Sequence, residues 1–146
     1  GLELTFEHGV DLPPVLVNAY SLEEVVLNLL NNARDAVEEA IADGDPVQEP
    51  HVLVRTALSQ TAGEPHVLIE VIDAGTGIPE HVLPRVFDPF YSTKDPNRGT
   101  GLGLAVSRTI VEQFGGQLQL TSEPGQGTRA TILLPPASAE ALASET

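Results

Sequence analysis

The residues best placed to do chemistry lie in two short glycine-rich segments, residues 73–79 (DAGTGIP) and 99–104 (GTGLGL). Glycine lets a backbone approach a ligand closely and adopt positive φ, and free backbone N–H groups at the start of a helix bind anions. Between the two segments lies a basic and aromatic run at residues 87–94 (FDPFYSTK). One glycine segment alone is weak evidence, but two around such an insert favour a phosphate-binding pocket with a hinged cover.

Two asparagines, Asn28 and Asn32, are the candidate metal-binding side chains. Their i, i+4 spacing puts both amides on the same side of a helix, and Asp35 falls on the same polar face. Mg2+ prefers hard oxygen ligands and usually keeps several waters while phosphates complete its shell. Neutral amide oxygens contribute to such a shell without repelling phosphate. A solvated helix surface is the alternative, and it explains one asparagine better than two beside a pocket.

Asp73 ends an apolar run and precedes two glycines, so its carboxylate stands at the base of a tight loop. A buried acceptor in that position could bind an exocyclic amine, and an ordinary Asx turn is the alternative. In the second segment, glycines lead into a helix whose N-terminal amides and dipole favour phosphate. There the alternative is a flexible loop before a capped helix.

The insert between the glycine segments has the composition of a lid. Phe87 and Phe90 could dock it onto the body while residues 91–98 move. After closure, Arg98 and Lys94, the only lysine of the chain, could reach a terminal phosphate where the local dielectric is low. Core aromatics followed by a solvated basic turn are the alternative.

Composition restricts the class of protein. The 146 residues suit one domain, which we place at residues 1–135, followed by a flexible tail at residues 136–146. The net charge of -14 argues against nucleic acid or an anionic membrane as partner. No cysteine is present, which excludes disulfides and thiolate chemistry, and no apolar run approaches the ~20 residues of a membrane helix. The absence of methionine and the start at Gly1 suggest a segment of a longer protein.

Hydrophobic periodicity predicts the elements that position these residues. Alternation indicates strands at residues 2–6, 51–57, 66–72, 117–121 and 128–134, and a short apolar run at residues 15–17 predicts a second strand before the first helix. A capping box at residues 21–24 opens a helix that runs to about Ala42, and a second helix begins in the second glycine segment and ends at Gly115 and Gly116. The order predicts an α+β fold, a two-layer α/β sandwich whose mixed, mostly antiparallel sheet is covered on one face by about three helices.

Each helix has one predicted core face. In the first helix it consists of Leu22, Val26, Leu29, Ala33, Ala36, Val37 and Ala40. In the second it consists of Leu102, Val106, Ile110 and Phe114. No glycine fingerprint joins a first strand directly to its helix and no P-loop occurs, so the Rossmann unit and the P-loop are excluded.

Five segments, in this order along the chain, resemble the sequence boxes of the catalytic, ATP-binding domain of sensor histidine kinases. They are residues 28–33 (N box), 73–77 (G1), 87–90 (F), 99–104 (G2) and 125–128 (G3). The resemblance covers residues 21–135, and the runs FYSTK and GTGLGL are most similar to those of the nitrogen-regulatory group. It implies the Bergerat fold, which gyrase-type ATPases share.

The resemblance implies a role for individual residues. Asn32 would coordinate Mg2+, Asn28 would contact phosphate or metal, and Asp73 would bind the adenine amine. Asn28, Lys94 and Arg98 would assist phosphoryl transfer. The other residues that would contact ATP or ADP are Asp35, Gly75, Gly77, Ile78, Tyr91, Ser92, Thr93, Lys94, Gly99, Thr100, Gly101, Leu102, Gly103, Leu104 and Thr128.

One departure from the wider superfamily bears on the reaction. Gyrase-type ATPases carry a general-base glutamate one helical turn before the metal-binding asparagine, where this chain has Asn28. An amide accepts no proton at neutral pH, so steady activation of water is not expected. The resemblance implies instead a protein histidine kinase that transfers the γ-phosphoryl group to a histidine followed by an acidic residue. The four histidines, each followed by Gly or Val, lack that motif: His8, His51, His66 and His81.

The resemblance also implies partners and location. The expected partners are the helical dimerisation and phosphoacceptor domain of the same kinase and a cognate response regulator. The full-length protein would be a homodimer and this segment a monomer that binds ATP without autophosphorylation. The location would be cytoplasmic, with or without a membrane anchor in the parent kinase. The alternatives are a gyrase-type nucleotide-gated ATPase and a non-catalytic nucleotide-binding scaffold.

Overall fold

The computed structural model describes residues 2–44, 51–61, 63–89, 103–123 and 126–138. Its elements are β1 (Glu3–Glu7), α1 (Ala19–Ala42), β2 (His51–Thr61), β3 (Glu64–Asp73), the short 3-10 helix η1 (Leu83–Arg85), α2 (Gly103–Gln113), β4 (Gln117–Glu123) and β5 (Gly127–Leu134). Each of the five alternating segments is a strand, as predicted. The β2–β3 hairpin extends well beyond the predicted strands, because cross-strand pairing continues to Thr61 and Glu64.

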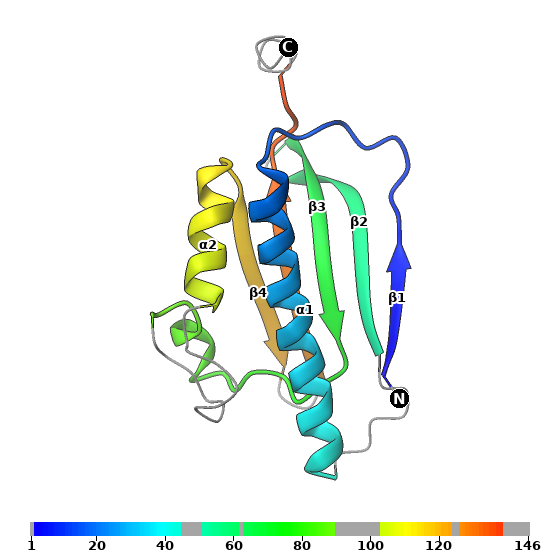
Figure 1. The fold of residues 1–146 in the computed structure, drawn as a ribbon, viewed down its shortest axis with the longest axis vertical. Helices are drawn as coiled ribbons and strands as arrows, with labels where there is room; N and C mark the ends of the chain where they lie inside the picture. Colours follow the sequence, from blue (N-terminus) through cyan, green and yellow to red (C-terminus); the bar gives the residue numbers. More distant parts are fainter. Residues whose placement is uncertain (1, 45–50, 62, 90–102, 124–125, 139–146) are drawn as a thin grey trace.

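The five strands form one sheet in the order β1-β2-β3-β5-β4. β1 pairs with β2 in parallel, and all other neighbours pair antiparallel. α1 and α2 pack together on one face of this sheet (Figure 1). The predicted two-layer α+β sandwich with a mixed, mostly antiparallel sheet is confirmed. In the part of the chain that the structure describes, two α-helices and η1 are found where about three helices were predicted.

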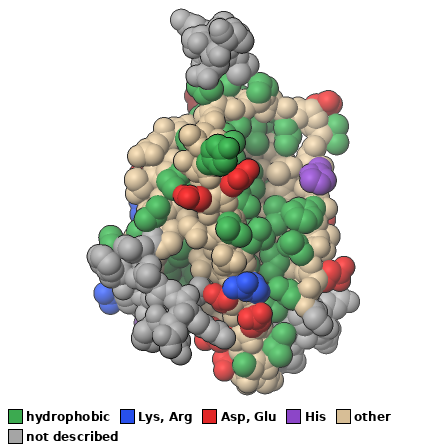
Figure 2. All heavy atoms as spheres, in the orientation of Figure 1, with side chains coloured by type: hydrophobic (Ala, Val, Ile, Leu, Met, Phe, Trp, Pro, Cys, Tyr) green, Lys and Arg blue, Asp and Glu red, His purple; other side chains and the backbone are tan. Residues whose placement is uncertain are grey.

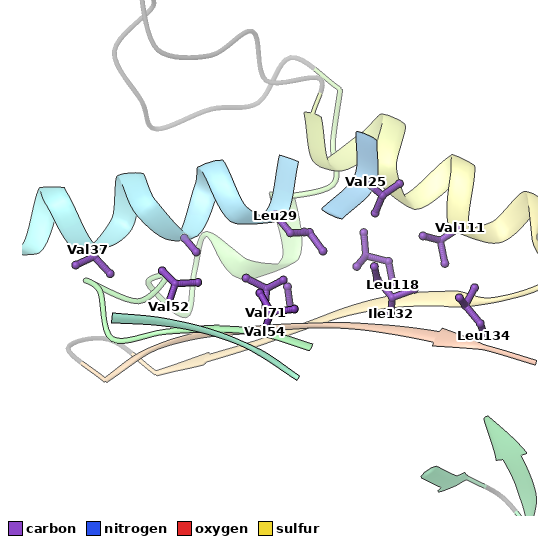
Figure 3. Close-up of a cluster of buried hydrophobic side chains, with 12 residues drawn as sticks. Val25, Leu29, Val37, Val52, Val54, Val71, Val111, Leu118, Ile132 and Leu134 are labelled. Atoms are coloured by element: carbon purple, nitrogen blue, oxygen red, sulfur yellow. The ribbon is translucent and has the colours of Figure 1, made fainter. Parts of the chain in front are cut away.

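The core lies between the two helices and the sheet (Figure 3). Val25 and Leu29 of α1, together with Val111 of α2, face Val71 of β3 and Ile132 of β5. Buried residues recur every three or four positions along α1 and every second position along β2, β3 and β5, so each of these strands has one side toward the helices. A polar residue at such an inward position is therefore held in the space between the two layers.

The start of α1 differs from the prediction. The helix begins at Ala19, and its N-cap is Asn18, whose Oδ1 accepts a hydrogen bond from the Ser21 backbone N–H at 3.1 Å. Ser21 therefore lies inside the helix, and the predicted capping box of Ser21 with Glu24 is wrong. Asparagine caps a helix as well as serine does, and Asn18 comes three residues earlier. The predicted end of the helix at Ala42 is confirmed.

The predicted core face is largely confirmed for α1 and is displaced by about one residue for α2. In α1 most of the predicted residues, among them Leu29 and Val37, are buried, although Val25 is fully buried whereas the predicted Val26 is only half-buried. In α2, Val106 is 46% exposed, and the buried residues are Ser107 and Val111. The reason is that α2 packs against both α1 and β4, which buries the stripe between these neighbours.

Two apolar segments outside the core differ in their roles. The predicted second strand at residues 15–17 is wrong, because these residues form no strand, although Val15 and Val17 pack against the core. All five residues of β1 are exposed, and hydrophobic side chains appear at the surface over β1 and β2 (Figure 2). Near the other terminus, the Ala137 backbone N–H donates to Pro14 O at 2.8 Å. None of the described helices combines the length and apolar character that crossing a membrane requires.

Candidate functional site

Three polar side chains lie next to one another across β3, β5 and β4. Asp73 is the register partner of Thr128, and Thr128 is the partner of Ser122. Each occupies an inward position, in phase with the buried residues of its strand. Antiparallel pairing thus places a polar row at one end of the space between sheet and helices.

Asp73 is the buried acceptor of this row, with 7% of its surface exposed. Its Oδ1 accepts hydrogen bonds from the Gly75 N–H at 2.9 Å and from the Thr128 N–H at 3.3 Å. Burial raises the pKa of Asp73 to about 6, although the two backbone hydrogen bonds act in the opposite direction. The contact with Gly75 is the Asx turn considered above, and the same carboxylate is ionised at neutral pH and available to a hydrogen-bond donor.

The first glycine segment packs directly against α1. A Cβ on Gly75 would lie 2.6 Å from the backbone carbonyl carbon of Ala36, so only glycine fits there. The Thr76 N–H donates to Ala36 O at 3.4 Å, and Gly77 has a φ of 73°, which favours glycine. The two glycines are therefore needed for different reasons, one for close packing and one for the turn.

Ser122 connects this loop to the β4–β5 hairpin. Its Oγ accepts a hydrogen bond from the Ile78 N–H at 2.6 Å, donates to Gly127 O at 3.0 Å and lies 3.0 Å from Thr128 Oγ1. Gly127 has a φ of +107°, and a Cβ on it would lie 2.0 Å from Asp73 O. The Ser122 hydroxyl group therefore joins the loop of residues 73–79 to the β4–β5 hairpin and to Thr128.

Ser122 is not among the site residues predicted from the sequence. The feature of the sequence that could have identified it is its place in the strand alternation. Ser122 follows Leu118 and Leu120 at two-residue spacing, on the inward side of β4. A polar residue in that apolar series is unusual, and its partner Ile78 is 44 residues away in the chain.

A second polar contact lies between the two helices. Asn28 of α1 donates from Nδ2 to Ser107 Oγ of α2 at 3.2 Å. Ser107 is fully buried and was also missed, although it precedes Val111 by one turn on the apolar side of α2. A Cβ on Gly103 would lie 3.9 Å from Asn28 Cγ. Asn28 thus meets the first turn of α2, and the N-terminal end of a helix attracts anions.

The remaining predicted residues fall around these two centres. Asn32 and Asp35 follow Asn28 along α1 and are half-buried, and Asp35 Oδ1 lies 3.3 Å from Arg34 Nη2. Leu104 packs against the core. Ala36, behind the glycine loop, is eight residues from Asn28, about 12 Å along the helix axis. α1 therefore passes both the acceptor site, beside Ala36, and the anion-attracting site, beside Asn28. The distance between them is one that an extended nucleotide can span.

The base of the insert is anchored. Phe87 packs against the core cluster, as predicted, and the Arg108 guanidinium carbon lies 5.1 Å from the centroid of its ring. The predicted site residues that lie outside the described residues are Tyr91, Ser92, Thr93, Lys94, Arg98, Gly99, Thr100, Gly101 and Leu102, together with Phe90.

Comparison with known proteins identifies the family. Residues 18–138 match the family described as histidine kinase-, DNA gyrase B- and HSP90-like ATPases. The chain is 38% identical over 139 residues to sensor kinase CckA of Brucella abortus, covering 92% of this chain and 14% of CckA. Identity to sporulation kinase E of Bacillus subtilis is 41% over 132 residues, 86% of this chain and 15% of that kinase. Sensor histidine kinase ZraS of Escherichia coli K12 is 35% identical over 134 residues, 92% of this chain and 26% of ZraS.

Solved structures share the fold. Full-length ShkA, in complex with AMPPNP, has a TM-score of 0.70 and 26% identity over 95% of this chain and 26% of ShkA. The nucleotide-free catalytic domain of histidine kinase ThkA has a TM-score of 0.68 and 23% identity over 92% of this chain and 78% of that domain. The chain spans 14% to 26% of the length of the three kinases compared by sequence. The resemblance to the ATP-binding domain of sensor histidine kinases is confirmed, and the chain belongs to the family of histidine kinase-, DNA gyrase B- and HSP90-like ATPases.

Proposed function

We propose that this chain is the Mg-ATP-binding catalytic domain of a two-component sensor histidine kinase and that it donates the γ-phosphoryl group to a histidine on a separate helical domain. The observation that carries the proposal is the position of Asn28, where α1 meets the first turn of α2. By resemblance, a gyrase-type ATPase has its general-base glutamate there. An amide cannot take a proton from water, so Asn28 suits a site that orients a phosphoryl donor rather than one that hydrolyses it.

The two centres of the site divide the nucleotide between them. Asp73 accepts a hydrogen bond from the adenine amine, and Gly75 and Gly77 let the loop backbone lie close to the base. The phosphates lie toward the first turn of α2, near Asn28 and Gly103, where N–H groups and the helix dipole stabilise negative charge. The length of α1 between these centres supports this orientation.

Mg2+ is part of the proposal because the donor set fits a shared metal. Within the described ranges, no group of three or more His, Cys, Asp or Glu side chains could hold a metal by itself. Amide oxygens of Asn28 and Asn32, completed by phosphate oxygens and water, are suitable hard ligands. When bound, Mg2+ supplies charge neutralisation for the phosphates. α1 itself holds the two amides one turn apart, which fixes their direction.

The insert completes the site in this proposal. Lys94 and Arg98 neutralise the terminal phosphate during transfer, while Tyr91, Ser92, Thr93 and residues 99–102 contact the nucleotide. The anchoring of Phe87 on the core supports a cover with a fixed base. In-line attack by the acceptor histidine then needs positioning and charge stabilisation rather than a base on this chain.

The partners follow from the same reaction. We propose a helical dimerisation domain that carries the acceptor histidine, a response regulator that receives the phosphoryl group, and a homodimeric parent kinase. Because the proposed phosphoryl transfer uses ATP, we place the reaction in the cytoplasm, where ATP is supplied. The sensor-kinase relatives support this arrangement.

The test is phosphoryl transfer between separated domains. The chain, Mg-ATP labelled at the γ-phosphate and the helical domain of the same kinase are mixed, and labelled phosphohistidine is measured on the helical domain. We expect label there and none on the chain alone. Asn28→Ala should abolish transfer, whereas Asn31→Ala, which removes a neighbouring half-buried amide, serves as the matched control. Steady ATP hydrolysis by the chain without transfer would favour the gyrase-type alternative, and absence of nucleotide binding would favour the scaffold.

A further inference from the structure

Ser122 uses its full hydrogen-bonding capacity inside the protein. A serine hydroxyl has one hydrogen to donate and two lone pairs. Gly127 O can only accept, so the hydrogen of Ser122 is directed to it, at 3.0 Å. The Ile78 N–H can only donate, so it occupies one lone pair of Ser122, at 2.6 Å. One lone pair remains, and Thr128 Oγ1 lies next to it at 3.0 Å.

This inventory determines the direction of the contact between Ser122 and Thr128. Since Ser122 has only a lone pair left, the Thr128 hydroxyl must donate its single hydrogen to Ser122. The reverse direction would deprive Gly127 O of its side-chain donor. Thr128 Oγ1 therefore offers only lone pairs to a ligand.

The neighbouring carboxylate of Asp73 also presents only hydrogen-bond acceptors. Asp73 accepts the Gly75 and Thr128 backbone N–H groups through Oδ1 alone, and among the described residues its Oδ2 has no donor. Asp73 Oδ2 and Thr128 Oγ1 thus present two acceptors side by side on paired residues. In a region of low dielectric such a pair favours an amine and disfavours a carbonyl, which would be left facing lone pairs.

We propose that Ser122 is a specificity-determining residue that, by fixing the direction of the Thr128 hydroxyl, makes the site select 6-amino purines over 6-oxo purines. The inference deepens the proposed function and rests on nucleotide binding at Asp73. Ser122 does not itself reach the base in this arrangement. It acts as a positioning residue through Thr128.

Two diphosphates that differ at the purine 6-position test the proposal, and no metal is required. Affinities for ADP and IDP are measured by calorimetry for the wild-type chain, Ser122→Ala and Ser122→Thr. Ser122→Ala releases the Thr128 hydrogen, which can then turn toward the 6-oxo group of IDP. We expect the preference for ADP over IDP to fall about three- to tenfold, as loss of one oriented hydrogen bond would produce. Ser122→Thr keeps a hydroxyl and should restore the wild-type preference.

A second background separates orientation from structural support. In Thr128→Val the hydroxyl is absent, so adding Ser122→Ala should leave the ADP-to-IDP preference unchanged. If Ser122 only supports the loop through Ile78, Ser122→Ala weakens both ligands equally and the preference stays at the wild-type value, which overturns the inference. Ser122→Cys, a much weaker hydrogen-bonding partner, replaces the alanine variant if that variant does not fold. A wild-type chain that binds neither diphosphate overturns the proposed function and this inference together.

Discussion

The two ends of the site are built differently. At the base end, Asp73, Thr128 and Ser122 sit on three neighbouring strands whose register is fixed by paired backbones. At the phosphate end, Asn28 and Ser107 join two helices through one side-chain hydrogen bond of 3.2 Å. We propose that the base end is a preformed recognition surface and that phosphates and metal complete the phosphate end, which suits a group whose bonds change during a reaction.

The glycines at the two ends of the site also differ in how closely they are packed. A Cβ on Gly127 would lie 2.0 Å from Asp73 O, whereas a Cβ on Gly103 would come no closer than 3.9 Å to Asn28 Cγ. Gly127 is required by close backbone packing, whereas the described residues leave room for a side chain at Gly103. Without nucleotide, a substitution at the base end should consequently cost far more stability than one at the phosphate end.

The largest effect is expected from Gly127→Ala. The clash with Asp73 O comes on top of an unfavourable positive φ, so we expect the free energy of unfolding to fall by about 3 kcal/mol or more in urea denaturation. Gly63→Ala is the matched control, because Gly63 has a φ of +79° with nothing within 4 Å, and it should cost about 1 kcal/mol. Gly103→Ala should be neutral or slightly stabilising. Equal losses at Gly127 and Gly103 would contradict the difference between the two ends.

Asp73→Asn should have the next largest effect, on affinity. The amide keeps an oxygen for the Gly75 and Thr128 N–H groups but turns an NH2 toward the adenine amine. We expect ADP affinity measured by calorimetry to fall about 30- to 100-fold, or 2 to 3 kcal/mol.

Glu70→Gln is the control for removing a buried carboxylate. Glu70 is on β3 as well, but it lies on the opposite face of the sheet, where its carboxylate oxygens lie 2.9 Å from Arg55 Nη1 and 3.3 Å from Arg129 Nε. ADP affinity in this variant should stay within about twofold of wild type, since the change is remote from the row. If Asp73→Asn binds ADP as the wild type does, the base end is assigned incorrectly.

The pH dependence should be specific to the base end. Because burial raises the pKa of Asp73 to about 6, ionised Asp73 decreases about tenfold between pH 7 and pH 5, and ADP affinity should decrease with it. Stability should change in the opposite direction. Between pH 4 and 6 the folded chain holds a proton that the unfolded chain has released, so the contribution of Asp73 to the free energy of unfolding falls as the pH rises.

Calorimetry measures how ADP affinity changes with pH, and urea denaturation measures how the free energy of unfolding changes with pH. Asp73→Asn is the reference for both. The variant removes the titrating group but keeps every other source of pH dependence, including the phosphates of ADP. Equal slopes for the variant and the wild type would exclude Asp73 as their origin.

Ser107→Ala should have the smallest effect. It removes the partner of Asn28, which is half-buried and can turn to water, so thermal unfolding should indicate a loss of about 1 kcal/mol. ADP affinity without metal should remain within about twofold of wild type. Thr109→Ala, which removes an exposed hydroxyl that donates to Ala105 O in the same helix, is the control. A loss of ADP affinity as large as that of Asp73→Asn would mean that the two ends are not separate.

The sequence predicts those parts of the site that depend on residues close together in the chain. Asn28 and Asn32 are one turn apart, and Asp73 directly precedes the glycines that shape its loop. Residue type and spacing are sufficient to single out such residues, whose ligand-binding roles stay predictions. The strands were predicted for the same reason, since alternation is a property of neighbouring residues.

Ser107 and Ser122 could not be predicted in that way. Their partners Asn28 and Ile78 are 79 and 44 residues distant, so their roles exist only after the layers have packed. The displaced core face of α2 has a similar origin, because two neighbouring elements decide which stripe is buried. The N-cap at Asn18 is a local feature that was predicted at the wrong residue, since two capping residues compete within four positions.

β1 lies at the opposite edge of the sheet from Ser122, and all five of its residues are exposed. Releasing this strand breaks the backbone ladder to β2 and uncovers only the part of Leu4 and Phe6, about half of each, that is not already exposed. Such an opening is a local event that leaves Asp73, Thr128 and Ser122 paired. Amide hydrogens of Glu3–Glu7 should therefore exchange with deuterium through fraying, at a small fraction of the free energy that exchange at the central strand β3 requires. This edge can detach and reattach while the nucleotide site remains folded.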